Sequence, residues 1–251
     1  MIDFHSHILP GIDDGASDVK MSLDMLAKSY EQGVKTVVAT PHCYLTKDEK
    51  IEHFLEKRQK SFNILIDAMK NDERAFPEVI LGCELGVYRE PSDVKELQKL
   101  CIENTDYILV EMPYEKWNVN NYDFIYLLKI NGMKPIIAHI ERYWVQRNDF
   151  YNLFSLDVLF QVNADFFLTP NSRKKVIPYL FENNALHILG SDMHNTTTRS
   201  SNMKQASEYI SLKYGNDRFG YLMNNAYEVL NNNDVKKFRF PPLGFFEKIK
   251  L

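Results

Sequence analysis

The feature that most constrains the fold is an alternation of short apolar runs with longer amphipathic segments along the chain. The runs are rich in Val, Ile and Leu without strict alternation of apolar and polar residues, as expected of strands covered on both faces. This order predicts a parallel sheet in an α/β protein. The predicted strands are Ile2–His5, Thr36–Thr40, Val79–Cys83, Tyr107–Val110, Pro135–Ala138, Val158–Val162 and His187–Gly190.

The segments between the runs carry the helical pattern. The first, Val19–Gln32, has an N-cap candidate in Ser17 or Asp18, and Gly33 follows its end. A length of 251 residues fits two small domains or one α/β barrel, but no linker, repeat or break in composition divides the chain. We therefore predict a single domain over residues 1–251. The other predicted helices are Lys50–Met69, Pro91–Cys101, Tyr122–Asn131, Arg173–Asn183, Ser201–Lys213 and Asp217–Asn231.

Potential metal ligands directly follow six of the seven predicted strands. Barrel enzymes keep their chemistry at the carboxyl ends of their strands, so these side chains are expected at one end of the sheet. A single histidine is more often a core or surface residue than a ligand, but that explanation would have to hold independently at six strand ends. The sixth strand ends instead in the uncharged Gln161 and Asn163. The candidate ligands are His5, His7, His42, Glu84, Glu111, His139, Asp192 and His194.

The spacing and type of these residues suit a metal centre. His5 and His7 are two residues apart, so an extended chain directs both imidazoles to one side, and Asp192 and His194 repeat this spacing. Imidazole and carboxylate donors without thiolate suit manganese, iron or zinc. Because so many ligands exceed the needs of one ion, we expect two or three divalent metals that share a bridging carboxylate.

Charged residues in the adjoining loops extend the candidate site. Asp13 and Asp14 lie in a Gly-Ile-Asp-Asp-Gly segment that predicts a turn, and one of the two is a site candidate. Arg142 and Arg199 follow the ligands of the fifth and seventh strands. Guanidinium groups bind phosphate oxygens in a bidentate manner. The alternative for each arginine is a surface salt bridge.

Composition limits the compartment and the partners. No apolar stretch reaches the ~18 residues of a membrane span, and the N-terminus lacks the features of a secretory signal, so no membrane insertion is expected. Cys43, Cys83 and Cys101 are best explained as reduced thiols of a cytoplasmic protein. A net charge of −4 disfavours nucleic acid as a partner. The oligomeric state stays open.

Five segments of the chain form a recognisable combination. They are MIDFHSH at 1–7, GIDDG at 11–15, ATPH at 39–42, IAHIER at 137–142 and GSDMH at 190–194. Together they resemble the polymerase-and-histidinol-phosphatase (PHP) superfamily, and within it the bacterial capsule-type, manganese-dependent protein tyrosine phosphatases. The resemblance extends from residue 1 to about Asn231. It implies a distorted, TIM-like (β/α)7 barrel of seven strands that holds three metals, with manganese as the expected ion.

The resemblance also implies roles and partners. Carried over by position, it makes Arg142 and Arg199 phosphate-binding residues and Asp14 the acidic residue of the first loop. It implies hydrolysis of phosphotyrosine in the tyrosine-rich tail of a membrane-associated bacterial kinase that controls capsular or exopolysaccharide synthesis. The metal ligands it implies are His5, His7, His42, Glu84, Glu111, His139, Asp192 and His194.

Other functions compete with this one. Cys83 and Arg89 have the C-x5-R spacing of thiol-dependent tyrosine phosphatases, but the charge of Glu84 beside the thiol would repel both thiolate and phosphate. A small-molecule phosphatase of the histidinol-phosphate type, or a nuclease, would keep the same fold. A barrel that has kept its ligands but acts only as a binding partner is a further alternative.

Two aromatic segments have open roles. Tyr143 and Trp144, next to Arg142, either stack on a substrate ring or pack in the core. The C-terminal tail, Phe238–Leu251, is aromatic and interrupted by prolines. It is expected to pack back onto the barrel or to contact a partner.

Overall fold

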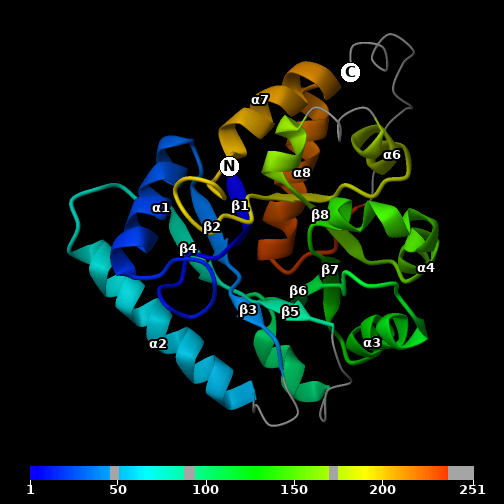
Figure 1. The fold of residues 1–251 in the computed structure, drawn as a ribbon, viewed down its shortest axis with the longest axis horizontal. Coiled ribbons are helices and arrows are strands. Elements are labelled where there is room, and N and C mark those ends of the chain that lie inside the picture. The colour runs from blue at the N-terminus through cyan, green and yellow to red at the C-terminus, as the bar shows by residue number, and fades with distance from the viewer. Residues whose placement is uncertain (46–50, 88–93, 170–174, 237–251) are drawn as a thin grey trace.

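The strands lie at the centre of the molecule and the helices lie around them (Figure 1). The structure is a computed structural model that describes residues 1–45, 51–87, 94–169 and 175–236. Arg89 and the tail Phe238–Leu251 fall outside the described residues. The strands are β1 (Ile2–Ser6), β2 (Thr36–Ala39), β3 (His42–Cys43), β4 (Glu78–Leu81), β5 (Glu84–Gly86), β6 (Tyr107–Glu111), β7 (Lys134–Ile137), β8 (Leu159–Asn163) and β9 (Ile188–Gly190).

All pairings between these strands are parallel, which confirms the predicted α/β class. They form two sheets, with the orders β1-β2-β4 and β3-β5-β6-β7-β8-β9. The chain just beyond β9 returns to β1, where Ser6 and Met193 form a parallel bridge. Gly190 permits this approach, because a Cβ atom there would lie 2.6 Å from Cβ of His5. The strands therefore make a curled parallel sheet whose first and last strands meet.

Two short strands that were not predicted, β3 and β5, each follow closely after a predicted one. The run Thr36–Thr40 becomes β2, and the chain pairs again as β3 only after Pro41, which has no N–H to donate to a strand ladder. The run Val79–Cys83 becomes β4, and β5 begins after Cys83. At each break the chain passes from the first sheet to the second, so the breaks contribute to the curl.

The helices largely follow the predicted segments. Asp18 caps α1 by accepting a hydrogen bond from the N–H of Met21 at 2.9 Å, and Asn118 caps α3 ahead of its predicted start. The segment around η1 is 3-10 rather than α-helical, and η2, α4 and η3 were not predicted. No helix in the described ranges is long and apolar enough to cross a membrane. The α-helices are α1 (Val19–Glu31), α2 (Ile51–Lys70), α3 (Val119–Ile130), α4 (Phe150–Ser155), α6 (Val176–Glu182), α7 (Met203–Tyr214) and α8 (Asn216–Leu230), and the 3-10 helices are η1 (Lys95–Leu100), η2 (Ile140–Asp149) and η3 (Ala164–Leu168).

Helix α8 covers the amino-terminal end of the strands. Just beyond this helix, Asn232 accepts a hydrogen bond from the N–H of Asp106 at 3.0 Å, directly before β6. A buried apolar cluster inside the curl joins the strands to this helix. The carboxyl ends of the strands are therefore left as the place for polar chemistry. The cluster includes Phe4, Val38, Leu109, Ile136, Leu159, Ile188, Ala226 and Val229.

Candidate metal centre

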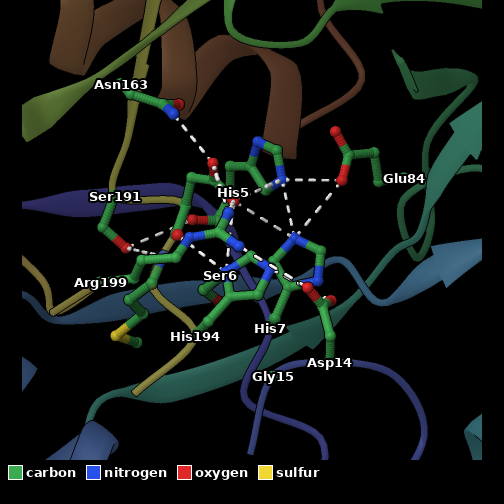
Figure 2. Close-up of polar contacts among 12 residues, drawn as sticks. His5, Ser6, His7, Asp14, Gly15, Glu84, Asn163, Ser191, His194 and Arg199 are labelled. Carbon is green, nitrogen blue, oxygen red and sulfur yellow. Dashed lines mark hydrogen bonds and ion pairs between the residues drawn. The ribbon is translucent and has the colours of Figure 1, made fainter. Parts of the chain in front are cut away.

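Glu84, the first residue of β5, lies at the centre of the predicted ligands. Its Oε2 atom is 3.1 Å from Nδ1 of His42, 3.2 Å from Nε2 of His5 and 3.4 Å from Nε2 of His7. Its Oε1 atom is 2.8 Å from Nε2 of His139. Figure 2 shows the side chains of His5, His7 and Glu84 directed toward one another. One carboxylate therefore contacts four imidazoles from three separate strand ends, those of β1, β3 and β7.

Asp192 is the second carboxylate on which predicted site residues converge. Its Oδ1 atom is 3.4 Å from Nε2 of His7 and 3.5 Å from Nδ1 of His194. Arg142 donates to Oδ2 of Asp192, and Arg199 donates to Oδ1 at 3.1 Å. The two predicted phosphate-binding arginines thus lie beside the ligands and hold the same carboxylate.

The remaining predicted residues lie at the edge of this cluster. Oε1 of Glu111 is 3.6 Å from Nε2 of His139. Oδ1 of Asp14 is 3.3 Å from Nε2 of His42 and 3.3 Å from Nε2 of His194, and its side chain is 62% exposed. All eleven predicted site residues are therefore brought together by the fold, while their metal- and phosphate-binding roles stay predictions.

Unusual backbone conformations support the convergence of the ligands. His139 (φ +30°) and Asp192 (φ +52°) both have a positive φ, which is uncommon for residues other than glycine. Such strained positions concentrate at functional sites. Gly15 lets the first loop lie against the ligands, because a Cβ atom there would be 2.1 Å from the carbonyl oxygen of His7.

Three carboxylates of the site, those of Glu84, Asp192 and Asp13, have a lowered pKa and are ionised at neutral pH. Burial raises the pKa of Glu84, but the neighbouring imidazoles, His5 first, outweigh burial and bring the pKa well below its usual value. The same balance lowers the pKa of Asp192. Burial also opposes ionisation of Asp13, yet the hydrogen bond from His7 brings the pKa of Asp13 to about 2. A buried set of ionised carboxylates among imidazoles is suited to bind cations.

The donor atoms form three groups that fit divalent metal ions. In each group, one ligand atom per residue lies within 4.8 Å of the others. His7, His42 and Glu84 each belong to two groups, so they are the candidate shared ligands. Oε2 of Glu84 is buried and accepts no hydrogen bond, which costs free energy. Coordination of a cation by this oxygen would remove that cost. The groups are His7, Asp14, His42 and His194; His5, His7 and Glu84; and His42, Glu84 and Glu111.

The sequence pattern alone left Asp13 and Asp14 as alternatives, and the family resemblance favoured Asp14. Asp13 accepts hydrogen bonds from Nδ1 of His7 at 2.7 Å, from the N–H of Gly15 at 2.9 Å and from the N–H of His42 at 3.0 Å. A proton held on Nδ1 leaves the lone pair of His7 on Nε2, where it faces Glu84 and Asp192. Asp13 is thus a positioning residue, whereas Asp14 is the one that offers an oxygen to a donor group.

Gln161 and Asn163 are positioning residues whose function the sequence did not indicate. Oε1 of Gln161 lies 3.1 Å from Nδ1 of His5 and accepts the N–H of His139 at 2.8 Å. The amide of Gln161 donates to Asn163, and Asn163 donates to Asp192 at 2.9 Å. Because an amide oxygen can only accept, it holds the proton of His5 on Nδ1 and leaves Nε2 for a metal. One chain of amides therefore orients three predicted ligands.

This network makes a prediction about metal affinity. We expect Gln161→Met to weaken manganese binding by about 10–100-fold, because His5 loses the acceptor that fixes its tautomer. Isothermal titration calorimetry with manganese measures the effect. Gln146→Met is the matched control, since Gln146 is also buried but its oxygen accepts from the N–H of Trp117 instead. Wild-type manganese affinity in Gln161→Met would contradict the positioning role.

The structure also decides two open questions from the sequence. The suggestion that Tyr143 stacks on a substrate ring is wrong, because its side chain is buried and its hydroxyl donates to the carbonyl oxygen of Met112. Trp144 packs edge-on against Tyr179. Cys83 is fully buried, and its thiol donates to the carbonyl oxygen of Leu100. A thiol in this position is not accessible to a phosphoester, which argues against the C-x5-R alternative.

The fold and the site define an α/β protein with a histidine–carboxylate centre at the carboxyl ends of a curled parallel sheet, as in metal-dependent hydrolases. The chain belongs to the CpsB/CapC family of capsular polysaccharide synthesis, whose family model matches residues 1–231. This result confirms the resemblance to the capsule-type phosphatases.

Individual relatives agree with this assignment. Tyrosine-protein phosphatase YwqE of Bacillus subtilis is 30% identical over 96% of this chain and 95% of that protein. Tyrosine-protein phosphatase CpsB of Streptococcus pneumoniae is 30% identical over 86% of this chain and 91% of that protein. Among solved structures, one described as YwqE from Bacillus subtilis and CpsB from Streptococcus pneumoniae, unique metal-dependent tyrosine phosphatases, superposes with a TM-score of 0.80. It is 26% identical and covers 97% of this chain and 100% of that chain.

Proposed function

We propose that the chain is a metal-dependent protein-tyrosine phosphatase. Its substrate is the tyrosine-phosphorylated tail of a membrane-associated bacterial kinase that controls capsular or exopolysaccharide synthesis. The observation that carries the proposal is the clustering of eight histidine and carboxylate donors, with Glu84 and Asp192 at their centre, beside two arginines. The chain belongs to the same family as proteins named tyrosine phosphatases and aligns with most of their length.

The predicted ligands would hold two or three divalent ions, with manganese favoured and iron or zinc as alternatives. Bound ions supply Lewis-acid chemistry, which neutralises phosphate oxygens and makes water a stronger nucleophile at neutral pH. The protein supplies the rest. Glu84 spans two donor groups, and Asp13 and Gln161 keep the lone pairs of His7 and His5 directed inward.

Arg142 and Arg199 would stabilise the charge on the equatorial phosphate oxygens during in-line displacement of the phenolate. Both side chains are partly exposed while their guanidinium groups contact Asp192, so they reach from the site toward solvent. A tyrosine leaves as a phenolate whose parent pKa is near 10, so it needs less protonation than a serine alkoxide. Asp14 and His42, 3.3 Å apart at the edge of the site, are the candidate proton donors.

We also propose that the curled sheet is a distorted seven-stranded barrel and that the chain is one domain. Two observations support this. Counting β2 with β3 and β4 with β5 as interrupted strands leaves seven, and the bridge between Ser6 and Met193 brings the chain after β9 to β1. We expect the protein to act in the cytoplasm, because Cys83 and Cys101 are free thiols.

Substrate preference tests this function. We expect kcat/KM for a phosphotyrosine peptide to exceed that for histidinol phosphate by about tenfold or more, since a site built for an aromatic leaving group discriminates by the contacts it makes with the ring. Both substrates are assayed with the same manganese-loaded preparation. The reverse preference would favour the small-molecule phosphatase. Hydrolysis of neither substrate would contradict the proposal.

A further inference from the structure

A pocket of about 370 Å³ opens beside the metal centre, between the first loop, the β3 segment and helix α2. Its lining combines two kinds of residue. Asp13, Asp14, His42 and Lys57 make up its polar side, and Ile12, Leu45 and Phe54 make up its apolar side. A volume of this size is in the range of small-ligand sites, which combine an apolar lining with a few well-placed polar groups.

The polar side of the pocket contributes to a predicted metal site. Asp14 and His42 belong, with His7 and His194, to one of the three donor groups. Arg199 is also close, since its Nη1 atom lies 3.7 Å from Oδ2 of Asp14. A phosphate held by this donor group and Arg199 would therefore stand at the edge of the pocket.

The apolar side suits an uncharged ring. Phe54 of α2 is buried, while Ile12 and Leu45 are half-buried and keep apolar surface toward the pocket. Tyr44 also lines the pocket and is 42% exposed, and its hydroxyl is held by hydrogen bonds with His42 at 2.9 Å and Glu111 at 2.7 Å. The ring of Tyr44 is thereby fixed in position. A phosphotyrosine carries its phosphate directly on a rigid ring, so the ring must lie next to wherever the phosphate binds.

We propose that this pocket, lined by Ile12, Tyr44, Leu45 and Phe54, binds the aromatic ring of the phosphotyrosine while the phosphate lies at Asp14 and His42. The proposal rests on the phosphatase function above and adds to it the surface that selects an aryl over an alkyl phosphoester. Stacking of Tyr143 on the substrate ring was one alternative from the sequence, but Tyr143 is buried. We therefore assign the ring to the β3 side of the site and not to the β7 side.

Two phosphonates isolate the contribution of the ring. Phenylphosphonate and methylphosphonate carry the same anionic group, and only the first has a ring to place in the pocket. We expect manganese-loaded wild-type protein to bind phenylphosphonate about tenfold more tightly or better, measured by isothermal titration calorimetry. In Leu45→Ser, and separately in Ile12→Ala, we expect this ratio to fall to about threefold or less while methylphosphonate binding stays within about twofold.

Leu212→Ser is the matched control, because Leu212 lies on α7 with 81% of its surface exposed and is expected to keep the wild-type ratio. An unchanged ratio in both pocket variants, or equal binding of the two phosphonates by wild-type protein, would overturn the proposal even if phosphotyrosine hydrolysis is intact. Binding is measured without turnover, so it tests the pocket separately from catalysis. A preference for phenylphosphonate that the pocket variants lose would support the pocket even if the protein does not hydrolyse the peptide. In that case only the proposed function is contradicted.

Discussion

Glu84→Gln is expected to lower kcat for a phosphotyrosine peptide by about a thousandfold or more. The reason is that Glu84 contacts His5, His42 and His139 within 3.2 Å and belongs to two of the three donor groups. Glutamine keeps the shape of the side chain but loses its charge and replaces one carboxylate oxygen by an NH2 group, which cannot ligate a metal. The assay is run at saturating manganese, and bound metal is counted by mass spectrometry.

The control for this variant is Glu103→Gln, at an exposed position away from the site. Circular dichroism shows whether Glu84→Gln stays folded. Full metal content together with wild-type kcat in the folded variant would mean that Glu84 is not a ligand.

Removing an arginine is expected to have the next largest effect. Arg142→Ala and Arg199→Ala should each lower kcat/KM by about 10²–10³-fold, the cost of losing one charge-stabilising group in a transition state. Lysine in place of either arginine should restore part of the rate, since it keeps the charge but not the planar fork. Steady-state kinetics on the phosphotyrosine peptide measures both effects.

Metal content separates two roles for these arginines. If they bind phosphate, both alanine variants keep their manganese; if they only hold Asp192 in place, metal is lost together with activity. Arg147→Ala is the matched control, because Arg147 lies in the same helix η2 as Arg142 but stacks on Trp144. A rate equal to that of the wild type in either alanine variant at the site would exclude that arginine from the chemistry.

The sequence predicted the location of the site because parallel strands end at a common edge. Whatever follows each strand is brought to that edge, so residues as distant as His5 and Asp192 could be assigned to one cluster without knowing any contact. The order of strands and helices was readable for the same reason: buried parallel strands require continuous apolar runs.

Local sequence could not predict features that depend on neighbours in space. The breaks between β2 and β3 and between β4 and β5 occur where the chain passes between sheets. The role of Gln161 depends on its lying across from His5, 156 residues away. The choice between Asp13 and Asp14 depends on which carboxylate the tight turn at Gly15 directs toward His7. An uncharged amide and a turn aspartate carry no signal of these roles in the sequence itself.

We expect the chain to hydrolyse phosphotyrosine with bound metal and not with a cysteine. The measurement is hydrolysis of a phosphotyrosine peptide by the purified protein in the presence of EDTA, then after addition of manganese, with iodoacetamide treatment in parallel. The buried position of Cys83 and the burial that raises the pKa of Cys101 to about 12 predict that alkylation leaves the rate unchanged. We expect EDTA to abolish activity and manganese to restore it. Activity that persists in EDTA and is lost on alkylation would contradict metal-dependent hydrolysis.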